Sequence, residues 1–178
     1  MTGKNRFFCR ISHSGSDLVN IINNFFYLVL DKEKLNLQKM ILFLTHESIT
    51  RRGAAAILIK NICFVSDDNS WLLGPSVDIL PALLLPLAGG SAIANLDMDD
   101  MERLPDDLQF LDESKEREPD SDIRIMLVEA IHLLCNKTED RKFIRGTKVL
   151  KMSTISLQTK QNFTYHSKFS KFVLGKVE

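Results

Sequence analysis

The sequence predicts an all-α protein, and three observations support that fold class. Apolar residues recur at helical spacing in several successive segments, short polar turns separate these segments, and two of the segments share one residue pattern. Hydrophobic residues make up 44% of the 178 residues and charged residues 26%, both close to the globular average. One domain with an ordinary buried core is therefore expected.

Three helices are expected in the first third of the chain. The second is short, covers residues 34–43 and ends near Leu44 and Thr45, and the third covers residues 48–64. The middle of the third helix is apolar nearly all round, which is typical of a helix covered on most sides. The first helix is expected in residues 16–30, where the residues at helical spacing are Leu18, Ile21, Ile22, Phe25, Phe26 and Val29.

The third helix matches a helix expected later in the chain. The two matching patterns are Thr50-Arg51-x-x-Ala54-x-x-Ile57-Leu58 and Ile123-Arg124-x-x-Leu127-x-x-Ala130-Ile131, at an offset of 73 residues. This pattern is typical of the inner helix of an armadillo or HEAT repeat, a unit of roughly 40 residues that buries its apolar face by stacking on the next unit. The expected architecture is therefore an armadillo/HEAT-like helical solenoid over residues 16–146.

A long acidic loop is expected between the matching helices. Residues 97–122 contain 12 acidic and 3 basic residues, a net charge of −9, so the rest of the chain, with 20 basic and 11 acidic residues, carries +9. The offset exceeds one repeat by about 30 residues. We therefore expect an inserted, solvated acidic loop at residues 89–120, where insertions cost little stability. Asp120, Ser121 and Asp122 are expected to cap the helix that follows.

The two ends of the chain differ from its centre. Residues 1–15 are expected to be a flexible N-terminus without a signal peptide. Residues 147–178 hold six lysines and no acid before Glu178, and are expected to form a divergent, partly disordered basic tail. The three cysteines form no CxxC pair and are expected to be buried, inert thiols. These features favour the cytoplasm as the location, with the nucleus as a second compartment.

One uncharged stretch, residues 79–96, has a length at the lower edge of a membrane span. Prolines and glycines interrupt it, and residues 79–88 alone are densely apolar. These ten residues are therefore expected to be a buried core helix, and no membrane contact is expected.

Five residues are candidates for contacts with a protein partner, and each has a second, structural interpretation. Arg51 and Arg52 open a helix, where they either bind an anion or partner or pair with carboxylates of a neighbouring turn. Lys60 and Asn61 either line a concave groove, in which the Asn61 amide bonds a bound peptide's backbone, or are simply solvent-exposed. Trp71 either anchors a loop onto the core or forms an exposed hot spot.

Other kinds of site lack their sequence signals. His132 and Cys135 share a helical face but supply two of the four ligands that a zinc site needs. The acidic stretch lacks EF-hand spacing, and Gly89-Gly90 follows a proline-broken helix rather than a strand. The basic residues are scattered and lack an aromatic stacking motif, so nucleic-acid binding is not expected. The sequence thus predicts a non-enzymatic binding protein without a metal, cofactor or small-molecule substrate.

Three segments resemble a known family. They are RRGAAAILIKNICF, WLLGPSVDILPALLLPLAGG and MERLPDDLQFLDESKEREPDSDIRIMLVEAIHLLC. They are similar to the eukaryotic Hgh-type armadillo-like proteins, also called brain protein 16 homologues, and the resemblance extends from about Phe26 to Gly146. The chain is about half the usual length of this family, and after Gly146 it no longer follows the family pattern.

The resemblance implies a cytosolic solenoid that acts as a chaperone adaptor. Such an adaptor brings newly made translation elongation factor 2 to the cytosolic chaperonin TRiC/CCT and needs no enzymatic activity. Two alternatives stay open. One is a general armadillo-like scaffold that binds proteins or nucleic acid, and the other is a truncated copy without independent activity.

Overall fold

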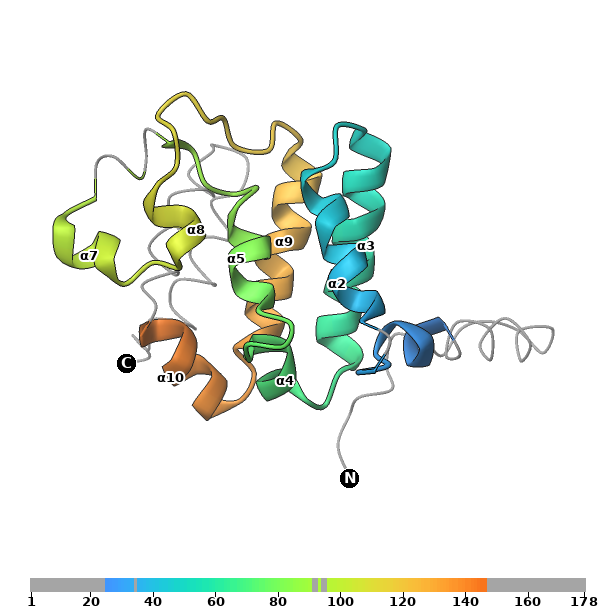
Figure 1. Ribbon diagram of the computed structural model, residues 1–178. Coiled ribbons are helices and arrows are strands. Elements are labelled where there is room, and N and C mark those ends of the chain that lie inside the picture. The colour runs from blue at the N-terminus through green and yellow to red at the C-terminus, as the bar shows by residue number, and fades with distance from the viewer. Residues whose placement is uncertain (1–24, 34, 91–92, 94–95, 147–178) are drawn as a thin grey trace, which may run out of the picture. The chain divides into compact units, whose positions relative to one another are not determined.

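The computed structural model describes residues 25–33, 35–90, 93 and 96–146. Regular structure in these ranges is helical and they contain no strand, which confirms the all-α prediction (Figure 1). The expected N-terminal segment 1–15 and the expected tail 147–178 lie outside the described residues. The helices are α2 (Asn36–Ile41), η1 (Leu42–Thr45), α3 (Ile49–Val65), α4 (Asn69–Leu73), α5 (Ile79–Leu84), α7 (Met98–Glu102), α8 (Asp106–Gln109), α9 (Ser121–Leu134) and α10 (Thr138–Gly146).

The chain separates into two compact units, Met1–Leu37 and Gln38–Glu178. In the first unit, residues 25–29 are helical, and Phe26 and Val29 are buried one turn apart, as the helical spacing predicts. The remainder of the helix expected in residues 16–30 falls largely outside the described residues.

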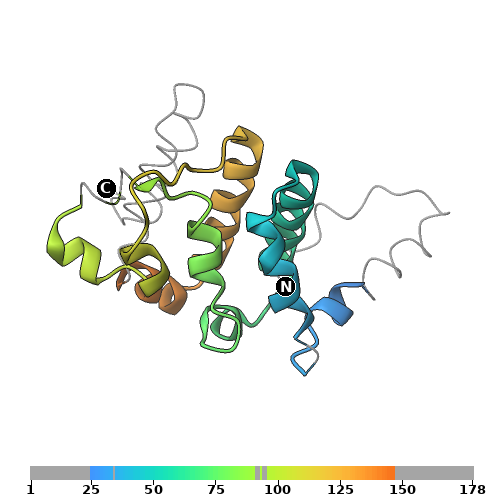
Figure 2. The ribbon, with the colours of Figure 1, turned by 45° about the horizontal axis from the view of Figure 1, so that its top comes forward.

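The second unit is built around two long helices, α3 and α9, which lie side by side and begin at the same end (Figures 1 and 2). The 3₁₀ helix η1 packs on α3, and α5 packs on α9. The unit therefore has two layers of helices, with α3 and α9 in one and η1 and α5 in the other. Because α3 and α9 begin at the same end, their first turns lie close together in space.

Helix α3 agrees with the predicted third helix to within one residue at each end. Its buried side consists of Ala55, Ala56, Ile59, Ile62 and Cys63, which recur at the spacing of a helix that packs on one side. The expectation that α3 is covered on most sides is wrong, because Ile57 is 48% and Phe64 is 44% exposed on the opposite side. The helix thus has a buried apolar side and an exposed one.

The two long helices share a burial pattern, at an offset of 72 residues rather than the expected 73. The burial pattern of α3 reappears in α9 at 72 residues, so the equivalent of Arg124 is Arg52 and not Arg51. The sequence alone did not show this, because Arg51 and Arg52 are adjacent and either one can be aligned with Arg124. The equivalent buried pairs are Ala55 and Leu127, Ala56 and Val128, Ile59 and Ile131, Ile62 and Leu134, and Cys63 and Cys135.

Helix α5 begins the uncharged stretch of residues 79–96, and Leu83, Leu84 and Leu87 in and after it are buried, as expected of a core helix. It ends at Leu84, and Pro86, two residues later, offers no N–H with which to continue the helical hydrogen bonds. No helix in the described part of the chain is long and apolar enough to cross a membrane.

The acidic segment between α5 and α9 was expected to be a loop throughout. This is wrong, because the segment contains the short helices α7 and α8. Two acidic residues in the first turn of α8, Asp106 and Asp107, interact favourably with the positive end of that helix. Leu104 and Leu108 are buried, and α8 packs on α5. The high charge of the segment concealed these two apolar anchors.

The last part of the acidic segment is fixed to the end of α5. The Lys115 ammonium donates hydrogen bonds to the carbonyl oxygens of Leu85 (2.7 Å) and Ala88 (2.8 Å), and the Glu118 N–H donates to Pro86 O (2.7 Å). At Gly90 a Cβ atom would lie 1.9 Å from the carbonyl oxygen of Asp112, so only glycine fits there. The backbone before α9 is therefore held in place on the core.

Candidate protein-binding surface

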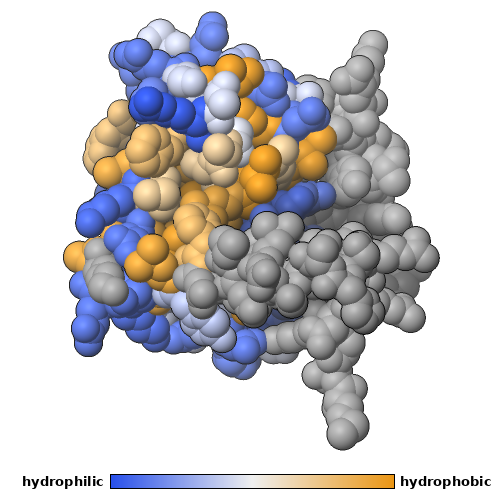
Figure 3. Space-filling model, turned by 90° about the vertical axis from the view of Figure 1, so that its right-hand side faces the viewer, coloured by the Kyte–Doolittle hydropathy of each residue, from blue (hydrophilic) through white to orange (hydrophobic). Residues whose placement is uncertain are grey.

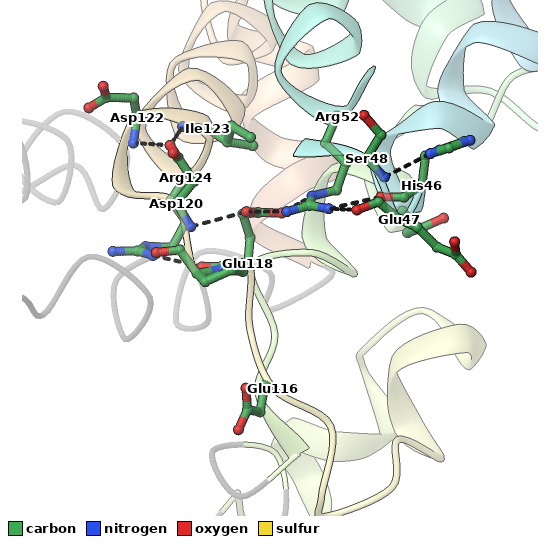
Figure 4. Close-up of polar contacts among 12 residues, drawn as sticks. His46, Glu47, Ser48, Arg52, Glu116, Glu118, Asp120, Asp122, Ile123 and Arg124 are labelled. Atoms are coloured by element: carbon green, nitrogen blue, oxygen red, sulfur yellow. Dashed lines mark hydrogen bonds and ion pairs between the residues drawn. The ribbon is translucent and has the colours of Figure 1, made fainter. Parts of the chain in front are cut away.

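The start of α3 is held by an arginine that lies four residues after the N-cap, Ser48. The Nη1 atom of Arg52 donates to the carbonyl oxygens of His46 (2.9 Å) and Glu47 (2.8 Å), which are six and five residues earlier (Figure 4). The guanidinium thereby satisfies backbone carbonyls at the corner through which the chain enters the helix.

Helix α9 begins with the same arrangement. Arg124 lies four residues after the N-cap, Asp120, and its Nη1 donates to the carbonyl oxygens of Glu118 (2.6 Å) and Pro119 (2.7 Å), again six and five residues earlier. The Asp120 carboxylate caps the helix by accepting from the N–H groups of Asp122 and Ile123, which confirms the predicted capping role of Asp120. The repeat thus extends to the hydrogen bonds, and it places Arg52 and Arg124 in equivalent positions.

Arg52 also joins the two helices. Its Nε donates to Glu118 Oε2 (2.6 Å) and its Nη2 to Glu118 Oε1 (3.2 Å), a two-pronged ion pair between α3 and the residues before α9 (Figure 4). The exposed fractions of the two side chains are 15% and 3%, so this is a buried pair rather than a surface one. The structural interpretation of Arg52 is therefore the one that the contacts support.

The other arginine of the doublet is placed differently. Arg51 is exposed, and its Nη1 lies 2.9 Å from His46 Nε2. It makes no ion pair with a carboxylate among the described residues, and its role as a partner contact stays a prediction.

The exposed side of α3 carries large apolar side chains. Ile57 and Phe64 lie two turns apart on it, and Val65 beside them is 41% exposed. Figure 3 views the molecule from the side on which α3 lies in Figure 1, and shows hydrophobic residues gathered in the middle of the coloured part of that side, with hydrophilic ones around them. We call the exposed residues Ala54, Ile57, Phe64 and Val65, together with Asn61 between them, the outer face of α3.

Lys60 and Asn61 are adjacent on α3 but differ in their contacts. The Lys60 ammonium forms an ion pair with Glu129 Oε2 of α9 (2.8 Å), and both side chains are about one third exposed. Asn61 is half-buried, and its carboxamide makes no hydrogen bond within the described part of the chain. The Asn61 amide is therefore available to a partner's backbone. Lys60 instead joins α3 to α9.

Trp71 lies on α4 rather than on a loop and is half-buried. Its backbone N–H donates to the N-cap carboxylate of Asp68 at 3.0 Å. Its role as a loop anchor or as an exposed hot spot stays a prediction.

A second link between the two repeated parts escaped the sequence analysis. Asn69 of α4 donates through Nδ2 to Asp140 Oδ2 of α10 (3.0 Å) and to the carbonyl oxygen of Leu134 (3.4 Å). Asn69 and Asp140 are 3% and 5% exposed. Neither residue stands out in sequence, because each is a polar residue near a helix start, where polar residues are ordinary.

The buried thiols have no sign of chemical reactivity. Burial raises the pKa of Cys63 and of Cys135 from 9.0 to about 12, so both remain protonated at neutral pH. This confirms the expectation of inert thiols for these two residues, whereas Cys9 lies outside the described residues. Burial also lowers the pKa of the half-buried His132. No group of three or more potential metal ligands occurs in the ranges that the structure describes.

Comparison with known proteins gives the family. A family model described as "Domain of unknown function (DUF383)" matches residues 14–125, well over half of the chain. The chain belongs to this family. Curated relatives carry the name Protein HGH1 homolog. That of Xenopus tropicalis is 44% identical over 123 residues, that of Homo sapiens 46% over 118, and that of Drosophila melanogaster 38% over 111. These matches cover 68%, 66% and 62% of this chain.

The matched region spans about a third of each relative, namely 33%, 30% and 29% of those three proteins. The DUF383 match includes the outer face of α3, the acidic segment and both arginines at the helix starts. It ends in the first turn of α9, so Glu129 and all of α10 lie beyond it. The region common to the family is therefore the one that carries the arginine-held helix starts and the outer face of α3.

Proposed function

We propose that this chain is a non-enzymatic adaptor that binds a protein client through the outer face of α3. The observation that carries the proposal is the exposure of Ile57 and Phe64 on a helix whose other side is fully packed. Large apolar side chains that share one exposed face favour contact with another protein. The amide of Asn61 between them adds a group that can bond a client's backbone without any chemistry on the client.

The proposed architecture behind this role is an armadillo-like solenoid. Two helix pairs, η1 with α3 and α5 with α9, follow one another at an offset of 72 residues with the same hydrogen bonds at the helix starts. Repeats of this kind form extended surfaces, which hold a large client by contact over a wide area. The HGH1 relatives are longer than the matched region, so in them the surface would continue over further units.

The proposed client is translation elongation factor 2, and the proposed second partner is the cytosolic chaperonin TRiC/CCT, to which the adaptor delivers it. This proposal follows from the resemblance to the Hgh-type proteins. The membership of this chain in the DUF383 family and its similarity to the HGH1 relatives support it. The proposed place of action is the cytoplasm, with the nucleus as a second compartment.

The test is capture of newly made elongation factor 2. The tagged full chain is added to a eukaryotic translation lysate that synthesises labelled elongation factor 2, and the bound material is probed for the label and for chaperonin. The test variant is Ile57→Asp/Phe64→Asp. The matched control is Phe143→Asp, because Phe143 on α10 is 51% exposed, close to the 44% of Phe64, but lies outside the outer face of α3.

We expect the unmodified chain and Phe143→Asp to capture both proteins, and Ile57→Asp/Phe64→Asp to lose at least about 90% of the labelled client, since burying a charge at an apolar contact is costly. Circular dichroism checks that each variant is folded. Equal capture by the test and control variants would contradict the proposed face. Capture of RNA instead, with a steep loss in salt, would contradict the adaptor role.

A further inference from the structure

Phe110, directly after α8, is a large apolar side chain that the fold leaves open to solvent. It is 88% exposed, the highest exposed fraction of any large apolar residue in the ranges that the structure describes. The apolar side chain two residues earlier, Leu108 of α8, is 0% exposed and lies in the core. The acidic segment therefore uses one apolar residue to attach itself to the core and presents another one outwards.

The backbone that carries Phe110 is fixed on both sides. Before it, α8 packs on α5, and the Gln109 side chain donates through Nε2 to the carbonyl oxygen of Leu104 (2.7 Å). After it, the Lys115 N–H donates to the carbonyl oxygen of Asp112 (3.0 Å), and the Lys115 ammonium binds carbonyl oxygens after α5. An aromatic side chain on a fixed backbone loses little conformational entropy when a partner covers it.

The sequence around Phe110 is strongly acidic. Residues 106–114 contain no basic residue and four acidic ones, all of them exposed, namely Asp106, Asp107, Asp112 and Glu113. The nearest basic side chains are already engaged, since Arg103 pairs with Asp99 (3.1 Å) and the Lys115 ammonium donates to backbone carbonyls. The exposed ring therefore lies in a stretch of surface whose negative charge can attract a basic partner.

The negative charge of this surface also acts on the neighbouring helix. Burial and then repulsion by Asp107 raise the pKa of Asp78, the N-cap of α5. A positive charge that a partner brings near Asp107 would offset this repulsion, because it would attract both carboxylates.

We propose that Phe110 and the four acidic residues beside it form a docking surface, the Phe110 surface, for a protein partner that has an apolar pocket bordered by lysine and arginine side chains. The pocket takes the aromatic ring, and the basic side chains pair with the carboxylates and contact the face of the ring. Aromatic side chains are frequent anchors of protein interfaces, and complementary charge around an anchor speeds docking and fixes its orientation.

The Phe110 surface and the outer face of α3 belong to different parts of the second unit. Helix α8 packs on α5 and α5 on α9, and in Figures 1 and 2 α5 and α9 lie between α8 and α3. An adaptor that joins two proteins needs two such surfaces. For its partner the inference therefore rests on the proposed function, in which the outer face of α3 takes the client and the Phe110 surface takes the chaperonin.

The test measures binding of the tagged full chain to purified cytosolic chaperonin by biolayer interferometry. The test variant is Phe110→Ser. The matched control is Phe143→Ser, which removes the same ring from an exposed position on α10. A third variant, Glu113→Lys, reverses one charge of the Phe110 surface. Capture of labelled elongation factor 2 is measured with the same proteins, and circular dichroism verifies that each is folded.

We expect Phe110→Ser to weaken chaperonin binding at least about tenfold, because a few aromatic anchors carry much of the affinity of an interface. Phe143→Ser should leave the binding unchanged. Glu113→Lys should weaken it about threefold, and the unmodified chain should bind less tightly in about 300 mM salt than in about 50 mM salt. The three variants should capture elongation factor 2 as the unmodified chain does.

Equal chaperonin binding by Phe110→Ser and the unmodified chain would overturn the proposal, and so would binding that neither Glu113→Lys nor salt changes. Dimers of the unmodified chain in analytical ultracentrifugation that Phe110→Ser abolishes would make a second copy the occupant, which would also overturn it. No chaperonin binding by the unmodified chain would overturn both this inference and the proposed second partner. Chaperonin binding without capture of elongation factor 2 would contradict the proposed client alone.

Discussion

The starts of α3 and α9 place the same residue in the same geometry but give it different neighbours. Arg52 and Arg124 each bind the carbonyls five and six residues earlier, yet the second edge of Arg52 holds Glu118 and that of Arg124 holds no described residue. The comparison separates two roles of an arginine in a stacked-helix protein. One edge fixes the corner within a unit, and the other joins that unit to the next.

The largest effect on stability should come from breaking the ion pair between Arg52 and Glu118. Arg52→Met leaves the buried Glu118 carboxylate without its ion-pair partner, and we expect it to lower the free energy of unfolding by about 3 kcal/mol. Arg124→Met should cost less, about 2 kcal/mol, because it removes hydrogen bonds to carbonyls but strands no carboxylate. Urea unfolding followed by circular dichroism measures both. An Arg124 variant that is less stable than the Arg52 variant would contradict the comparison.

The buried thiols extend the comparison to the far ends of the helices, since Cys63 and Cys135 are also 72 residues apart. Burial raises the pKa of each thiol from 9.0 to about 12, so the folded state keeps a proton that the unfolded chain releases above pH 9. Stability is therefore full below about pH 9 and falls as pH rises towards 12. The loss is about 1.4 kcal/mol per pH unit and per thiol.

Urea unfolding at pH 8.5 and pH 10 checks this effect against Cys63→Ala and Cys135→Ala. Each alanine variant should lose less stability between the two pH values than the unmodified chain does. The same pH dependence in all three proteins would show that the thiols do not ionise on unfolding.

The N-caps provide a smaller contrast between the two starts. The Asp120 carboxylate accepts from two N–H groups of α9, whereas the Ser48 side chain makes no capping hydrogen bond to α3. We expect Asp120→Ala to cost about 1 kcal/mol and Ser48→Ala close to zero. Thermal unfolding of the two variants side by side measures the difference, and a larger cost for Ser48→Ala would count against the described cap geometry.

The smallest effect is expected for Lys60→Ala. Its ion pair with Glu129 joins α3 to α9, but both side chains are about a third exposed, so water and salt screen the attraction. The change in unfolding free energy should stay below about 0.5 kcal/mol and shrink further in 0.5 M salt. A cost above about 1 kcal/mol that persists in salt would make Lys60 a structural residue of the same rank as Arg52.

Much of the fold was predictable because it follows from local patterns. Periodicity placed α3 to within one residue, and residue type identified Asp120 as a cap. The repeat was predicted but shifted by one residue, because the Arg51-Arg52 doublet offers two alignments and only burial distinguishes them. The short helices α7 and α8 were missed, since Leu104 and Leu108 are two apolar residues among many acidic ones.

The candidate site was harder to predict than the fold. Arg52 was weighed correctly as a residue that pairs with a carboxylate, but its partner Glu118 lies 66 residues away, and no local signal separates it from the other acidic residues of its segment. The exposed side of α3 was hidden for a similar reason. A helix that is apolar on all sides looks buried in sequence, and only its packing shows which side stays open.

The central claim is that α3 and α9 are equivalent and that Glu118 joins one arginine through its side chain and the other only through its backbone. Two double-mutant cycles in the full chain test it, one with Arg52→Met and Glu118→Gln and one with Arg124→Met and Glu118→Gln. The account predicts a coupling energy of about 2 kcal/mol for Arg52 and below about 0.5 kcal/mol for Arg124. Equal coupling energies in the two cycles would contradict it.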